Sequence, residues 1–154
     1  AEVKTKAADA LWNLAVNNDN QVKIAREGGI APLIALLRDS SAEAKMSAAD
    51  VLAQLAYNKD NRVIIAREGG IGLLIALVRG DDCEEGKENA ADALGFLAFN
   101  EDNKVKIARE GGIAPLIALL RDGSAESKEN AAYALSNLAD DNEDNQVQIA
   151  REGG

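Results

Sequence analysis

One eleven-residue segment recurs four times along this chain, and the repetition constrains the fold more than any other feature of the sequence. The segment reads DNQVKIAREGG from Asp19, and close copies begin at Asp60, Asp102 and Asp144. Its isoleucine recurs at intervals of 41, 42 and 42 residues. The residues of a catalytic site occur once in a sequence, whereas a unit that buries its apolar face against copies of itself occurs repeatedly. The repetition therefore predicts an array of stacked units.

A second, apolar block keeps the same period. It reads AADALWNLA from Ala7, AADVLAQLA from Ala48, AADALGFLA from Ala90 and AAYALSNLA from Ala131. The one-residue differences in spacing fall in the polar stretches RGDDCEEG and DDNEDN. These stretches are predicted loops, where an extra residue is tolerated.

Each unit is predicted to contain three helices, which in the first complete copy cover about residues 20–27, 31–38 and 42–57. Asn18 or Asp19 is the expected N-cap of the first helix, and Gly28-Gly29 is its expected stop. Pro32 lies in the first turn of the second helix, where a missing N–H is harmless.

The third helix of the unit has its own start signal. Ser40 and Glu43 are expected to form a capping box there, and Asp82 and Glu85 take the same roles in the next copy. No single unit can bury its own apolar face. Stacking the units side by side gives a continuous core and a superhelix, of either hand on this reasoning alone.

A three-helix unit of about 42 residues that carries EGGIAPLIALLRDGSAESKENAAYALSNLA, from Glu110 to Ala139, resembles the armadillo repeat. HEAT and tetratricopeptide units lack its GG-I-x-P-L-I-x-L-L stretch, and the resemblance covers essentially the whole chain. It implies an all-α fold, a right-handed α-solenoid with three helices per repeat. The implied single array has a lone third helix at 1–19, full repeats at 20–58, 59–100 and 101–141, and a lone first helix at 142–154.

The resemblance also implies a function, because armadillo proteins use the concave lining of third helices to hold extended peptides. Importin-like members carry a Trp four residues before an Asn in this groove. At the Trp position this chain carries Asp9, Asp50, Asp92 and Tyr133. At the Asn position, Gln54 and Phe96 replace two of the four residues. These departures argue against a nuclear-import groove and leave a basic or mixed extended peptide as the expected partner.

The polar face of the third helix varies between copies, whereas IAREGG never changes. At 100° per residue, three positions of each copy fall on one stripe opposite the apolar side. The stripe holds Glu2, Asp9 and Asn13, then Glu43, Asp50 and Gln54, then Glu85, Asp92 and Phe96, and finally Glu126, Tyr133 and Asn137. Its flanking residues in the predicted site are Trp12, Asn89, Asn130 and Ser136. The alternative interpretation of these acids is an ordinary solvated helix face.

Every aromatic residue lies in or at the end of a predicted third helix. Phe96 falls on the polar stripe, where a core residue is not expected, and exposed aromatics beside acids are typical of binding hot spots. Tyr57 and Phe99 end their helices and are expected to pack under the following loop, so they are left out of the site. Trp12 either flanks the groove or covers the open N-terminal end of the core.

The predicted binding mechanism combines spacing and charge. Third helices pack roughly 8–10 Å apart, and an extended peptide advances about 3.3 Å per residue, so each repeat would serve two or three peptide residues. Asn13 and Asn137 are expected to hold peptide backbone amides, as the family resemblance suggests. The carboxylate rows would attract Lys and Arg side chains, with Phe96 and Tyr133 covering their aliphatic stems or cationic heads.

The overall charge favours the same partner. The chain carries 26 acidic and 17 basic residues, a net charge of −9, which repels phosphate backbones and makes nucleic-acid binding unfavourable. No stretch approaches the roughly 18 apolar residues of a membrane span. The single cysteine, Cys83, cannot form an internal disulfide, and a cytoplasmic or nuclear location is the mild default.

Catalysis is not expected. The chain has no histidine, and the acids around Cys83 disfavour a reactive thiolate. REGG lacks the residues of a phosphate-binding loop, and DDNEDN lacks the glycine of a calcium loop. No cofactor and no metal site is predicted. The competing function is structural assembly: apolar surface beside Val3 and Leu14 at one end and Ile149 at the other would be open to self-association, and the chain would then be a homo-oligomer or an engineered repeat protein.

Overall fold

The computed structural model describes residues 2–39, 41–80 and 83–154. Within these ranges the chain forms eleven helices and no strand. The first helices of the units are α2 (Asn18–Arg26), α5 (Lys59–Arg67), α8 (Glu101–Arg109) and α11 (Glu143–Glu152). The second helices are α3 (Ile30–Asp39), α6 (Gly70–Arg79) and α9 (Ile113–Asp122). The third helices are α1 (Glu2–Ala15), α4 (Ala42–Leu55), α7 (Glu84–Leu97) and α10 (Ala125–Ala139).

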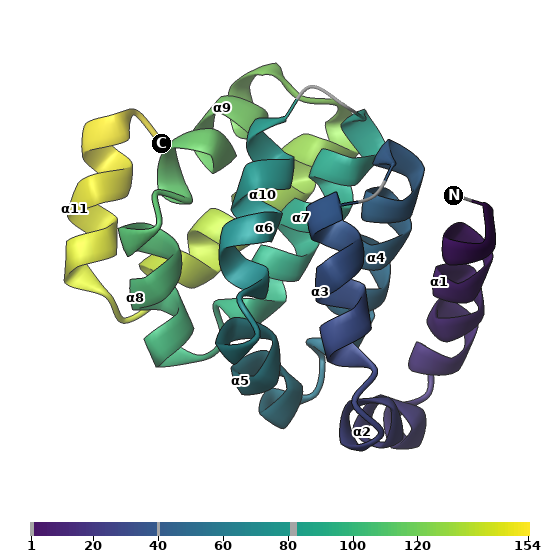
Figure 1. Cartoon of the computed structure of the whole chain (residues 1–154). Helices are drawn as coiled ribbons and strands as arrows, with labels where there is room; N and C mark the ends of the chain where they lie inside the picture. Colours follow the sequence, from purple (N-terminus) through teal and green to yellow (C-terminus); the bar gives the residue numbers. More distant parts are fainter. Residues whose placement is uncertain (1, 40, 81–82) are drawn as a thin grey trace.

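The third helices stack side by side in chain order. α4 packs between α1 and α7, and α7 packs between α4 and α10. Each second helix packs against its own third helix, while α2, α5 and α8 follow one another along the lower edge of the molecule (Figure 1). The result is the predicted all-α fold, a right-handed α-solenoid. Its third helices form one layer, and the second helices cover the back of that layer.

The first helices begin at asparagine caps. The caps are Asn17, Asn58, Asn100 and Asn142, and each side chain accepts a hydrogen bond from a backbone N–H of the first turn. The predicted caps Asn18 and Asp19 are therefore wrong by one or two residues, because α2 begins at Asn18. The polar run NNDN offers several capping side chains, and the sequence alone does not separate them.

The two glycines of IAREGG end these helices for different reasons. Gly28, Gly69, Gly111 and Gly153 have φ between 77° and 89°, in the left-handed region that favours glycine. The next glycine has no room for a side chain, since a Cβ at Gly70 would lie 2.7 Å from side-chain carbons of Ile34 and Ile65. The predicted helix stop is confirmed at Gly28-Gly29, and the pair also lets the second helix pack closely.

The third helix of the first complete unit begins at Ala42, as predicted, but its capping residue differs from the predicted one. The N-cap of α4 is Ser41, whose hydroxyl accepts from the N–H of Ala44 at 3.4 Å. The cap of α7 is Cys83, which makes no side-chain cap bond. The predicted capping residues Ser40 and Asp82 lie outside the described residues, and α4 ends at Leu55 rather than near residue 57.

The core combines small residues between third helices with branched residues beneath them. Alanines 48, 90 and 131 are fully buried where neighbouring third helices approach one another, and Leu52, Leu94 and Leu135 are buried on the same side. The burial of Leu135 confirms the predicted phase of the third helix. The stripe lies on the opposite side of the third helix, where Asp50, Asp92 and Phe96 are only partly buried.

Buried asparagines tie the units together. Asn61 Nδ2 donates to the carbonyl oxygen of Leu55 at 3.0 Å and to that of Gln21, one unit earlier, at 3.2 Å. Asn103 repeats this arrangement with Leu97 at 3.1 Å and Arg62 at 3.2 Å. The bonds to Leu55 and Leu97 satisfy carbonyl groups at the ends of α4 and α7, and the bonds to Gln21 and Arg62 join neighbouring units.

Candidate functional site

The variable stripe of the third helices divides into two parts of different chemistry. The first part, the acidic pocket, lies on α1, α4 and α7. The second part, the aromatic cluster, lies where α4, α7 and α10 meet. The two parts share some positions of the repeat, because the stacked units present equivalent residues side by side.

The acidic pocket is a cavity of about 410 Å³. Its lining residues are Asp9, Trp12, Asn13, Met46, Ser47, Asp50, Glu85 and Asn89. Six of these are predicted site residues that the fold brings together from three helices. Met46 and Ser47 were missed, although they lie four and three residues before Asp50 and hence share its helix face.

Partial burial and crowding of like charges perturb the carboxylates of this region. Burial is the main cause that raises the pKa of Asp50, and the charge of Glu85 adds to it, whereas hydrogen bonds from Trp12 and Gln54 lower it. The pKa of Asp92 rises to about 6, first through burial and then through the charges of Asp50 and Glu88. An added positive charge would relieve this repulsion and lower the pKa values of Asp50 and Asp92.

Trp12 faces the neighbouring third helix. Its ring lines the acidic pocket, and its side chain hydrogen-bonds to Asp50 of the next third helix. The structure thus places it at the flank of the site, the first of the two alternatives left open by the sequence.

The aromatic cluster consists of Tyr57, Phe96, Phe99 and Tyr133. Phe96 is its centre, with ring centroids 4.1 Å from Tyr57, 6.4 Å from Phe99 and 5.5 Å from Tyr133. Tyr57 and Phe99 do not pack beneath the loops as expected, since 53% and 50% of their surfaces are exposed. Their signal was present in the sequence: both occupy the same position of consecutive units.

A glycine makes room for this cluster. A Cβ at Gly95 would lie 2.7 Å from Cδ1 of Tyr133 on the neighbouring helix. The position of Gly95 corresponds to that of Trp12, and Tyr133 corresponds to Asp50. In the acidic pocket the large residue of the pair is therefore Trp12, on the earlier helix, α1. In the aromatic cluster it is Tyr133, on the later helix, α10.

The asparagines of the predicted site already donate hydrogen bonds within the protein. Asn89 and Asn130 donate to carbonyl oxygens of the preceding third helix, those of Met46 and Glu88, at 3.3 Å. Asn137 Nδ2 likewise donates to Gly95 at 3.0 Å, whereas Asn13 Nδ2 donates to Asp9 on its own helix at 3.0 Å. Stacking of helices thus uses an N–H group of three of these side chains, and their amide oxygens take no part in those bonds.

Comparison with known proteins agrees with this geometry. A model of the Armadillo/beta-catenin-like repeat matches residues 100–140. A designed armadillo repeat protein superposes on 97% of the chain with a TM-score of 0.90 and 30% identity. Another, in complex with the peptide (KR)4, superposes on 99% with a TM-score of 0.91 and 30% identity.

The chain is built of armadillo repeats. A third similar structure belongs to computationally designed armadillo repeat proteins for modular peptide recognition, with 29% identity over 96% of the chain and a TM-score of 0.89. The chain spans only 63% or 64% of the length of these three proteins. No curated protein is similar enough to count as a relative.

The remaining predicted residues of the armadillo groove are dispersed. Glu43, Glu126 and Ser136 are exposed, and Gln54 contacts Asp50 rather than lining the acidic pocket. The side chain of Glu2 lies outside the described part of the structure. The stripe is thus continuous in sequence register, but the structure gathers only some of its residues into the pocket and the cluster.

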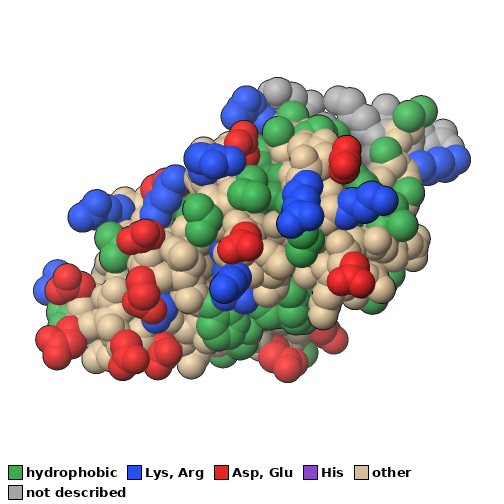
Figure 2. Space-filling view, turned by 90° about the horizontal axis from the view of Figure 1, so that it is seen from below, with side chains coloured by type: hydrophobic (Ala, Val, Ile, Leu, Met, Phe, Trp, Pro, Cys, Tyr) green, Lys and Arg blue, Asp and Glu red, His purple; other side chains and the backbone are tan. Residues whose placement is uncertain are grey.

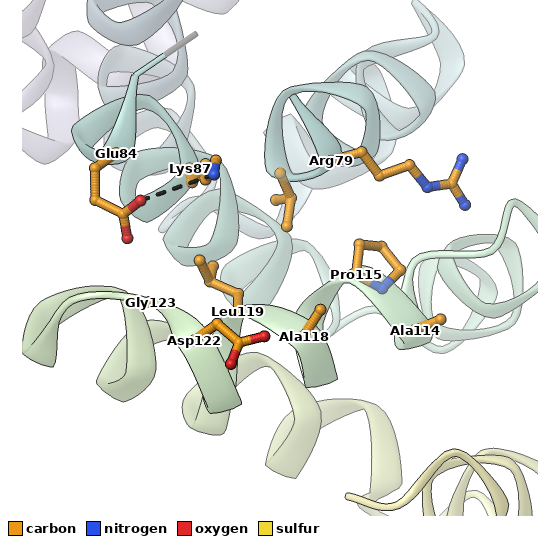
Figure 3. Close-up of a pocket in the computed structure, with 10 residues that line it drawn as sticks. Arg79, Glu84, Lys87, Ala114, Pro115, Ala118, Leu119, Asp122 and Gly123 are labelled. Carbon is orange, nitrogen blue, oxygen red and sulfur yellow. Dashed lines mark ion pairs between the residues drawn. The ribbon is translucent and has the colours of Figure 1, made fainter. Parts of the chain in front are cut away.

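A second cavity of the armadillo array, of about 460 Å³, lies away from this stripe, between α6, α7 and α9 (Figure 3). Glu84 lies at its edge and pairs with Lys87 at 3.8 Å. Its Oε1 accepts 3.0 Å hydrogen bonds from the N–H of Ser124 and the hydroxyl of Ser127, which lower the pKa of Glu84. Arg79 donates to the carbonyl oxygen of Gly111 at 2.8 Å. These charged groups therefore serve to join neighbouring repeats.

In the described ranges, no cluster of three or more His, Cys, Asp or Glu side chains is arranged to hold a metal ion. No described helix combines the length and the apolar character needed to cross a bilayer.

Proposed function

We propose that this armadillo array is a non-catalytic scaffold that holds an extended peptide along its third helices, with Lys or Arg side chains in the acidic pocket. The observation that carries the proposal is the acidic pocket itself. It concentrates Asp9, Asp50 and Glu85 around an indole ring, and the nearby Asp92 is destabilised as an anion. A cationic side chain would relieve that repulsion and could stack on Trp12.

The comparisons support the same chemistry. One similar structure holds the peptide (KR)4, and another was designed for modular peptide recognition. The bound peptide and the design purpose are properties of those two proteins. They make a basic peptide a well-motivated ligand to test on this chain.

The test uses a fluorescein-labelled peptide of ten alternating Lys and Arg residues. Its anisotropy is followed at low and at physiological salt. Because Trp12 is the only tryptophan and lines the acidic pocket, its emission reports occupancy of the pocket independently of the label. We expect saturable binding that weakens with salt and a change in Trp12 emission with the same midpoint.

Charge reversal inside and outside the pocket separates a specific site from general attraction. Asp50→Lys should weaken binding at least tenfold, and Glu152→Lys, which makes the same change of net charge at an exposed residue of α11, should weaken it much less. Equal effects of the two substitutions, or no binding at either salt, would contradict the proposal.

Self-assembly is the second candidate, and exposure of apolar residues at both ends favours it. Val3 is 81% and Leu14 50% exposed at one end, and Val147 is 57% exposed at the other. In inner repeats an isoleucine of a second helix fills the place beside the second glycine of IAREGG, as Ile34 does beside Gly70. At the N-terminal end the corresponding place is an open cavity of about 320 Å³. Light scattering that shows a size increasing with concentration, without peptide binding, would favour assembly.

A further inference from the structure

We propose that the aromatic cluster is an anchor site for one large uncharged side chain, aromatic or long aliphatic, of the same peptide whose basic residues occupy the acidic pocket. The proposal rests on the proposed function and specifies the ligand further. A preferred peptide would be bipartite, with a basic segment and a single apolar residue a short distance away.

The cluster offers a firm apolar surface that remains accessible. Phe96 and Tyr133 are partly buried and hold the rings in place, while the more exposed Tyr57 and Phe99 present their surfaces to solvent. Hydrophobic side chains gather near the lower edge of the molecule in Figure 2, with carboxylates on both sides. A rigid aromatic group with a polar rim is the usual composition of a binding hot spot.

A cation is disfavoured at the cluster because the protein already supplies one. The guanidinium carbon of Arg62 lies 5.0 Å from the centroid of Phe99. Its Nε donates to the carbonyl oxygen of Ala56 at 2.7 Å, and its Nη2 donates to that of Tyr57 at 3.0 Å. These bonds fix the charge in position, so a second Lys or Arg at this ring would be repelled. The ring surface that remains therefore suits an uncharged group.

The acidic pocket and the cluster are close enough for one short peptide. Phe96 follows Asp92 by four residues on α7, one helical turn along the same face. The charge of Asp92 also contributes, after burial, to raising the pKa of Tyr57. With third helices roughly 8–10 Å apart and about 3.3 Å per extended residue, the anchor should lie about three to six residues from the basic side chain.

Three kinds of fluorescein-labelled ten-residue peptide test the proposal on the wild-type protein. One is wholly basic, and the other two carry a Phe or an Ala four residues from a block of Lys and Arg. The Phe and Ala peptides are made with the substituted residue on either side of the block, because the direction of the bound peptide is part of the question. The Phe peptide in its better direction should bind about tenfold more tightly than the matched Ala peptide.

Variants then locate the effect. Tyr57→Ala and Phe99→Ala should each remove most of the preference for Phe, while the affinity for the wholly basic peptide stays within about twofold. Val147→Ala, a change at an equally exposed residue of α11, should preserve the preference. Circular dichroism melts establish that each variant is folded, and the comparison on wild-type protein stands even where a variant does not fold.

The outcomes distinguish this proposal from the proposed function. Binding of the wholly basic peptide with equal affinity for the Phe and Ala peptides overturns the anchor and leaves the peptide scaffold intact. The anchor is also overturned if Tyr57→Ala weakens binding of the wholly basic peptide as much as binding of the Phe peptide, because the cluster would then bind cations. A change of oligomeric size in the cluster variants would identify the rings as a contact between copies. Failure of every peptide contradicts the scaffold itself.

Discussion

The acidic pocket and the aromatic cluster occupy equivalent positions of one repeating frame, yet one is charged and the other is apolar. Asp50 and Tyr133 hold the same position of their helices, and so do Trp12 and Gly95. The first pair is joined by a hydrogen bond across neighbouring helices, and in the second pair the absence of a side chain admits a ring. The chemistry of the groove thus changes with a few side chains per unit while the stacking is retained.

This separation depends on a frame that is built largely from other side chains. Buried leucines, the glycine pair and the asparagine bonds to helix-end carbonyls recur in unit after unit. The comparison therefore makes a general claim: changes to the frame should alter stability, and changes to the stripe should alter binding.

The largest expected effect is on the frame. Leu135→Ala removes a buried side chain between α10 and the rest of the core and should lower the free energy of unfolding by about 2–5 kcal/mol. Chemical denaturation measures this change. Peptide affinity of the folded variant should stay close to that of the wild type. A loss of under about 1 kcal/mol would show that this side chain is not part of the frame.

The next prediction breaks the pairing of small and large residues across α7 and α10. Gly95→Ala gains helix propensity but places a methyl group against the Tyr133 ring, so it should destabilise the protein by about 1–3 kcal/mol. Adding Tyr133→Asp to this variant recreates the pair formed by Ala53 and Asp92 in the preceding unit. Denaturation of both single variants and the double variant completes the cycle.

The free energy of unfolding of the double variant, Gly95→Ala with Tyr133→Asp, tests whether the two positions are coupled. If the two positions are coupled, Gly95→Ala should cost much less when Asp occupies position 133, with a coupling of about 1 kcal/mol or more. Additive effects would mean that the ring tolerates the methyl group. The two parts of the groove would then differ in composition alone and not in how neighbouring helices fit.

A pH dependence should distinguish the acidic part from the aromatic part. The pKa of Asp92 is about 6 in the folded state against an ordinary 3.8, so the folded state holds the proton more tightly than the unfolded state. The resulting penalty is absent below about pH 4, grows as the pH rises and is complete above about pH 6. Asp92→Asn should therefore be more stable than the wild type by about 1 kcal/mol at pH 7.5, a value discounted for solvent screening.

The stabilisation by Asp92→Asn should shrink toward zero at pH 4, as measured by urea denaturation across this range. Glu152→Gln, at an exposed residue of α11, serves as the control and should show no such trend. A constant difference between wild type and Asp92→Asn at every pH would mean that Asp92 titrates normally. Basic-peptide affinity of the wild type should also fall below pH 6, since protonation removes the charge that attracts the ligand.

Some of the features behind these predictions could be predicted from the sequence, and others could not. The repeat, the helix phase around Leu135 and the glycine stop could be predicted because each is a local pattern that recurs in register. Helix caps were misplaced by a residue or two, since NNDN and DSS each contain several residues able to cap. Phe99 was missed because its partners, Arg62 and Tyr133, lie more than thirty residues away and meet it only through stacking. The raised pKa of Asp92 likewise depends on burial between units.

The smallest expected effect tests whether the asparagines of the groove belong to the frame or to the stripe. Asn130 donates to the carbonyl oxygen of Glu88 at 3.3 Å, a long hydrogen bond between partly buried groups. Its net contribution should be about 0.5 kcal/mol, and the better helix propensity of alanine offsets much of that loss. Asn130→Ala should therefore change the free energy of unfolding by less than about 0.5 kcal/mol in chemical denaturation. A loss above about 1 kcal/mol would assign Asn130 to the frame, and the stripe would then be less free to vary than the contrast between Asp50 and Tyr133 suggests.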